Sequence, residues 1–191
     1  MADRTPRRTT LDATAMRVLA HPLRSRLLGL LRLEGAATAT TLARALDTNT
    51  GATSYHLRKL AGVGLVEDTE AGQGRERVWR AAHDQHSWSS ASAGDDPDAR
   101  AAGDWLQGNA LRWFTEQAER WTREHDQWSD AWRDGGGTSD YFLRLTAAQL
   151  LELNQELSAV IERYAAAGPA FDDDARRVMV FVHTFPEGDP A

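Results

Sequence analysis

The feature that most constrains the fold is a series of short amphipathic segments between residues 11 and 64, separated by residues that start and stop helices. Pro22 suits the first turn of a helix, Gly35 stands where that helix would end, and Thr38 can cap another one. Apolar residues recur there at three- to four-residue spacing, namely Leu23, Leu27, Leu30, Leu31, Leu42, Leu46, Leu57 and Leu60. The pattern predicts helices over about 11–19, 22–34, 38–46 and 50–63, with Gly64 following the last one.

Two strand-like runs come next, over residues 65–69 and 75–81. The sequence Ala-Gly-Gln-Gly at 71–74 joins them, which predicts a β-hairpin with a glycine-rich tip and a basic return strand. Helices followed by a two-stranded wing are the order of a winged helix-turn-helix domain, in which the helix at 50–63 would be the recognition helix.

The residues of this region also resemble those of a known family. The resemblance is carried by LAHPLRSRLLGLL (19–31), LARAL (42–46), SYHLRKLAGVGLVE (54–67) and GRERVW (74–79). These runs resemble the ArsR-type winged-helix transcriptional regulators over about residues 11–82, and look most like actinobacterial members with an added C-terminal region. The resemblance implies a dimeric DNA-binding regulator, usually a repressor, whose operator affinity changes when an effector binds. Members that sense metals through thiolates carry cysteines near the third helix, whereas this chain has no cysteine, so thiolate-based sensing is not implied.

The helix at 50–63 is predicted to enter the DNA major groove. Ser, Thr and Arg side chains on its outer side can reach base edges, and the arginines of the wing suit backbone phosphates. The predicted DNA-binding residues are Asn49, Thr50, Ser54, Tyr55, Arg58, Lys59, Gln73, Arg75 and Arg77. Two interpretations of Tyr55 stay open, contact with a sugar or thymine methyl and packing against the wing. His56 is predicted to pack rather than to read a base.

The distribution of charge agrees with DNA binding by the N-terminal half alone. Residues 1–82 contain 13 Lys and Arg and 8 Asp and Glu, a net charge of +5. Residues 83–191 contain 9 basic and 20 acidic residues, a net charge of −11. A basic half joined to an acidic half indicates that only the first half meets a polyanion.

Composition predicts four parts along the chain. Residues 1–10 are polar and basic and are predicted to be a disordered tail, and residues 11–84 form the winged-helix domain. Residues 85–103, rich in Ser, Ala, Gly and Asp, are predicted to be a linker. Residues 104–187 form a C-terminal domain for dimerisation or effector binding.

The C-terminal domain is predicted to contain one long helix over 104–133 and a strand–helix–strand unit. The strands are expected at 141–145 and 177–184, on either side of a helix that opens with the capping box Thr146-Ala-Ala-Gln149. The predicted fold class is therefore mainly α with a small amount of β.

A stripe of large apolar residues follows one face of the long predicted helix. Its members are Leu106, Trp113, Phe114, Trp121, Trp128 and Trp132. Aromatic residues at helical spacing usually form core, but tryptophan is also enriched at dimer interfaces and in pocket walls. A dimer interface is the favoured interpretation and an apolar effector pocket the second, and the two are compatible.

The sequence gives little support for metal binding, catalysis or membrane insertion. His83, Asp84 and His86 are the best cluster for a metal, but they lie at the edge of the predicted linker, so no metal site and no cofactor are expected. No glycine-rich phosphate loop, HExxH or Gly-x-Ser-x-Gly motif is present, which argues against an enzyme. The longest apolar run, 178–182, is too short to cross a membrane, and no signal peptide is recognised, so a cytoplasmic location is expected.

These observations favour a homodimeric, sequence-specific regulator that binds an inverted-repeat operator in double-stranded DNA and responds to a small apolar effector. The alternative is a winged-helix adaptor that binds other proteins and does not read DNA.

Overall fold

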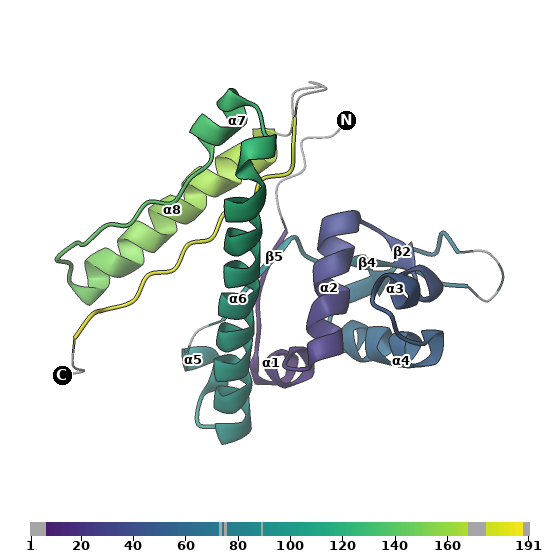
Figure 1. The fold of residues 1–191 in the computed structure, drawn as a ribbon. Coiled ribbons are helices and arrows are strands. Elements are labelled where there is room, and N and C mark those ends of the chain that lie inside the picture. Colours follow the sequence, from purple (N-terminus) through teal and green to yellow (C-terminus); the bar gives the residue numbers. More distant parts are fainter. Residues whose placement is uncertain (1–6, 73, 75, 89, 168–174, 189–191) are drawn as a thin grey trace. The chain divides into compact units, whose positions relative to one another are not determined.

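The computed structural model describes residues 7–72, 74, 76–88, 90–167 and 175–188, and Figure 1 traces them. The chain divides into two compact units, one that ends at Leu111 and one that begins at Arg112. The division falls inside a long helix, which contributes its first half to one unit and its second half to the other.

The first unit contains the four helices predicted from the sequence. They are α1 (Ala13–Leu19), α2 (Pro22–Glu34), α3 (Ala39–Ala45) and α4 (Thr50–Ala61). Asp12, Thr38 and Asn49 cap α1, α3 and α4, each accepting a hydrogen bond from the backbone N–H three residues further on. After α4, Gly64 takes a left-handed φ of 70°, so a residue without a side chain turns the chain into the next strand.

A three-stranded antiparallel sheet, in the order β2–β4–β3, completes the winged helix. β3 (Val66–Asp68) and β4 (Val78–Ala81) form the predicted hairpin, in which Val66 pairs with Ala81. β2 (Ala37–Thr38) pairs with β4 and was not predicted. Its two residues are too few to show the period-two pattern that reveals a strand.

The structure differs from the prediction of a linker over most of residues 85–103, and from the prediction of a disordered tail over 1–10 at its end, Arg8–Thr10. β1 (Arg8–Thr10) pairs in parallel with β5 (Gln85–Ser87). α5 (Ser90–Ala93) and the first half of α6 (Pro97–Glu124) follow. The small residues that suggested a linker are core residues instead, since Ala93, Ala99 and Ala102 are buried in the same cluster as the winged-helix leucines.

Leucine dominates the core of the first unit. The largest fully buried side chains are Leu11, Met16, Leu19, Leu27, Leu28, Leu42, Leu57, Leu60, Leu65 and Thr53. Each buried Leu or Met contributes roughly 1.5–3 kcal/mol relative to an exposed one, so this cluster fixes the position of α4 and of the wing.

The second unit is helical. It contains the second half of α6, a 3₁₀ turn (His125–Gln127), α7 (Asp130–Gly135) and α8 (Ala147–Ala167). The helix predicted over 104–133 therefore begins earlier and ends earlier than expected. It begins earlier because Asp96 accepts hydrogen bonds from the N–H groups of Asp98 and Ala99, which caps the helix start.

Neither segment predicted as a strand in this unit forms one, so the predicted strand–helix–strand unit is wrong. Residues 141–145 and 177–184 have no strand partner among the described residues. β-Propensity measures how well a side chain fits a pleated and half-buried surface, whereas Phe142 and Val180 are exposed here. The class itself, mainly α with a small amount of β, is correct. In the described part of the chain, no helix combines the length and the apolar character needed to cross a bilayer.

Candidate nucleic-acid interface

The recognition helix α4 is anchored through one side. Thr53, Leu57 and Leu60 are fully buried in the core, where the helix packs against α2 and α3. These three residues recur at positions i, i+4 and i+7, so the opposite side of the helix faces solvent. The structure thus presents Thr50, Tyr55, Arg58 and Lys59 as exposed side chains and leaves Ser54 half-buried.

The exposed side of α4 is basic and carries no compensating acid. The helix contains Arg58 and Lys59 in its last turn and no Asp or Glu over its whole length. The ammonium of Lys59 lies 5.6 Å from the centre of the Tyr55 ring, a cation–π contact. Neither cation forms an ion pair with a residue that the structure describes, so both can meet a phosphate without first giving up a carboxylate.

Tyr55 lies on the exposed side of α4. Its ring is 49% exposed, and its ring contacts are with His56, at 5.2 Å between centroids, and with Lys59. The exposed side chain is available for the contact with a sugar or thymine methyl that the sequence leaves open.

Asn49 has a structural task at the start of α4. Its Oδ1 accepts a hydrogen bond from Ala52 N–H at 2.7 Å, and its amide NH₂ group remains available as a donor to DNA. Asn49 is therefore both the cap that fixes the first turn of α4 and a candidate contact.

The wing holds the remaining predicted contacts. Arg77 lies 3.5 Å from a carboxylate oxygen of Asp68 and 5.9 Å from the centre of the Trp79 ring, with 62% of its side chain exposed. Binding a phosphate would compete with this surface ion pair, which is worth little in water. Gln73 and Arg75 lie outside the described residues.

Sequence reasoning missed Arg44, at the end of α3. The side chain is exposed, belongs to the last turn of α3, and forms no ion pair with the described residues. Its position in the first helix of the helix-turn-helix, which crosses the DNA backbone in such motifs, was the signal that could have identified it.

A pair of histidines joins the start of α2 to α4. The rings of His21 and His56 lie 4.5 Å apart between centroids, and Nδ1 of His21 accepts a hydrogen bond from Leu23 N–H. Burial, with the nearby positive charge of Arg24, lowers the pKa of both rings below the ordinary histidine value. His56 therefore packs as a neutral ring, in agreement with the packing role predicted for it.

The cluster considered for a metal is used in another way. Arg32 donates to the carbonyl of His83 at 3.0 Å and contacts Nδ1 of His86, whose ring stacks on Trp88. Burial lowers the pKa of His86 to about 3 and that of Arg32 to about 10. The described residues contain no group of three or more His, Cys, Asp or Glu that could hold a metal ion.

The aromatic stripe is divided among three surroundings. Leu106 is buried in the core of the first unit. Trp113 and Phe114 pack on Phe181, with ring centroids 5.3 and 4.8 Å apart. Trp128 lies between Trp121 and Trp132, at 6.2 and 6.0 Å. These ring contacts cover part of each side chain within the chain itself, whereas Trp113 and Trp128 remain exposed.

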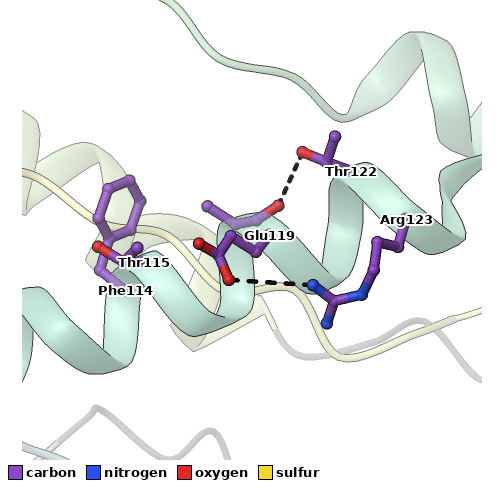
Figure 2. A pocket seen from close by; sticks show the side chains of 6 residues that line it. Phe114, Thr115, Glu119, Thr122 and Arg123 are labelled. Atoms are coloured by element: carbon purple, nitrogen blue, oxygen red, sulfur yellow. Dashed lines mark hydrogen bonds and ion pairs between the residues drawn. The ribbon is translucent and has the colours of Figure 1, made fainter.

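The second unit also has a shallow hollow of about 390 Å³ on α6. Figure 2 shows its lining, which consists of Phe114, Thr115, Ala118, Glu119, Thr122 and Arg123. Phe114 is its only member from the stripe, and Glu119 and Arg123 form an exposed ion pair at 3.9 Å across it. The tryptophans predicted to form a pocket wall do not line this hollow.

Comparison with known proteins supports the N-terminal assignment. Residues 19–69 match a family model described as a helix-turn-helix domain, and no curated protein matches the chain. Similar solved structures include a double mutant of ZitR from Lactococcus lactis, at 17% identity and a TM-score of 0.28, covering 73% of this chain and 74% of that one. The apo form of the same mutant has the same identity and TM-score and covers 74% and 83%. At such a TM-score these two structures add no argument, so the helix-turn-helix match is the informative result.

Proposed function

We propose that the protein is a sequence-specific DNA-binding transcriptional regulator of the ArsR type, that it acts as a homodimeric repressor in the cytoplasm, and that it has no enzymatic activity. One observation carries the proposal. α4 is fixed in the core by fully buried Leu57 and Leu60 and presents a face that bears two cations and no carboxylate. A helix of this kind fits the major groove, where charge provides affinity and polar side chains provide specificity.

The homodimer follows from how such domains read DNA. A single recognition helix reads only one half-site, and two copies related by a two-fold axis read an inverted repeat whose halves lie about one helical turn apart, or a multiple of it. The effector is proposed to be small and apolar, because the second unit is rich in exposed aromatic side chains and has no cysteine to hold a soft metal. Its binding would be measured as quenching of tryptophan emission.

The test is binding of the purified protein to a labelled duplex from the region upstream of its own gene, with a scrambled duplex of the same composition as the control. The proposal expects the upstream duplex to bind at least about a thousandfold more tightly than the scrambled one. Equal and weak binding of both duplexes would contradict sequence-specific regulation and favour the protein-interaction adaptor.

A further inference from the structure

The second unit buries none of its described side chains. Every buried residue of the protein for which burial is given lies between Leu11 and Leu106, and the described residues from 112 to 188 are all half-buried or exposed. A unit that fully buries no apolar side chain gains too little to offset the conformational entropy lost on folding. Its apolar surface therefore requires a covering partner.

The exposed apolar side chains of the second unit lie largely on α8, drawn in light green in Figure 1, and on segments 141–145 and 178–185. The side chains that face their own chain include Asn154, Ser158 and Glu162, which are half-buried and polar. Asn154 accepts a hydrogen bond from the hydroxyl of Thr184 at 3.0 Å and donates to the carbonyl of Leu150. From its middle to its C-terminal end the helix thus keeps Ser158 and Glu162 half-buried and leaves Leu157, Val160 and Tyr164 exposed.

An apolar stripe of α8 has the spacing of a coiled-coil seam. Leu150, Leu153, Leu157, Val160 and Tyr164 alternate steps of three and four residues, which is the a and d pattern of a heptad repeat. Exposure rises along the seam, from half-buried Leu150 and Leu153 to Leu157 at 36% and Tyr164 at 73%. A heptad seam is shaped for another helix with the same pattern, and a second copy of α8 is such a helix.

We propose that α8 pairs with α8 of a second copy of this chain in an antiparallel two-helix coiled coil. This interface is the contact surface of the homodimer in the proposed function, on which the inference rests. The orientation follows from the charges beside the seam. With Leu150 and Leu157 at a positions, Glu156 and Arg163 occupy g positions. In an antiparallel pair g faces g, so Glu156 of each copy meets Arg163 of the other, and the two-fold axis makes this ion pair twice. In a parallel pair g faces e of the partner, and the e positions hold Asn154 and Ile161, so no ion pair forms.

The length and the charge of the seam both agree with a second copy. From Leu150 to Tyr164 the seam extends over fourteen residue steps, about 21 Å along the helix, which is longer than a small molecule covers. DNA is excluded as the occupant because residues 83–191 carry 20 acidic and 9 basic residues.

The first test compares two Leu→Glu variants of the full chain by sedimentation equilibrium. Leu157→Glu places a carboxylate in the centre of the seam and should weaken the dimer by ~100-fold or more, because that charge would be buried without a partner. Leu151→Glu makes the same chemical change on the same helix, but Leu151 is 61% exposed and lies outside the seam, so this control should remain dimeric. Equal dimerisation of the two variants would overturn the proposal.

The second test reverses charges beside the seam and leaves the apolar residues of the seam unchanged. Glu156→Arg and Arg163→Glu should each weaken the dimer about fivefold, through two repulsive pairs of about 0.5 kcal/mol each, and the double variant should recover the wild-type Kd. Failure of the double variant to recover would contradict antiparallel pairing. A monomeric Trp121→Asp variant alongside a dimeric Leu157→Glu variant would place the interface on the aromatic stripe instead.

Measurement of DNA binding on the same samples separates the two proposals. If the wild type is a dimer disrupted by Leu157→Glu but binds no DNA, the interface is right and the regulatory function is wrong. If the wild type binds its upstream duplex specifically and Leu157→Glu neither dissociates the dimer nor weakens that binding, the function stands and the α8 interface is refuted.

Discussion

Replacing Arg58 by alanine tests how DNA affinity is built on the exposed side of α4. Arg58, Lys59, Arg75 and Arg77 are proposed to contact phosphates, which gives about eight contacts in a dimer. Each contact contributes about −0.9 to the slope of log affinity against log salt concentration, so the wild-type slope should be about −7. Arg58→Ala removes one contact from each copy and should reduce the slope to about −5.4.

The structure supports counting Arg58 as one full phosphate contact in each copy. Its side chain is exposed on a helix without acidic residues, so neutralising a phosphate breaks no ion pair with a described residue. Arg77 starts 3.5 Å from a carboxylate oxygen of Asp68 and should contribute less. The change of slope in Arg58→Ala therefore reports a phosphate contact that forms without replacing an ion pair within the protein.

The assay is fluorescence anisotropy of a labelled upstream duplex, titrated with protein at salt concentrations from about 50 to about 300 mM. Arg120→Ala is the matched control, because it removes the same charge from an exposed ion pair with Glu124 in the second unit and should leave the slope unchanged. A wild-type slope shallower than about −2 would falsify the proposed phosphate contacts, as would an Arg58→Ala slope equal to that of the wild type.

Three further predictions concern specificity, stability and pH. Alanine at Thr50, Ser54 or Tyr55 should weaken binding to the operator by about 1–3 kcal/mol and leave binding to scrambled DNA unchanged; equal losses on both duplexes would mean that these side chains do not read bases. Leu57→Ala should reduce the free energy of unfolding by about 2–5 kcal/mol in urea denaturation, because Leu57 is fully buried, whereas a loss below about 1 kcal/mol would contradict its place in the core. Burial lowers the pKa of His86 from 6.5 to about 3, so the folded protein holds this ring neutral while the unfolded chain protonates it. Stability is therefore complete above pH 6.5 and should fall by up to ~1.4 kcal/mol per pH unit below it, and His86→Gln should show a flatter pH profile; parallel profiles would show that another group is responsible.

The sequence alone determined the winged helix because its signals are local. Capping residues, Pro22 at a helix start and leucines at helical spacing each act within a few residues, and the structure has helices at the predicted places. The end of α4 is the exception, since the helix stops at Ala61 with Gly62 as its cap, two residues before the predicted end at Val63. The outward side of α4 was predictable for the same reason. Once Leu57 and Leu60 are assigned to the core, the helical period places Tyr55, Arg58 and Lys59 on the surface.

Only the tertiary structure decided the parts that depend on partners distant in sequence. β1 and β5 are more than seventy residues apart, as shown by the pairing of Arg8 with Gln85, and three-residue strands leave no period-two pattern to detect. Ala93, Ala99 and Ala102 have the composition of a linker and became core because a small side chain lets a helix approach closely. Segments 141–145 and 177–184 have strong β-propensity yet remain without a strand, since a strand exists only where another chain segment pairs with its backbone.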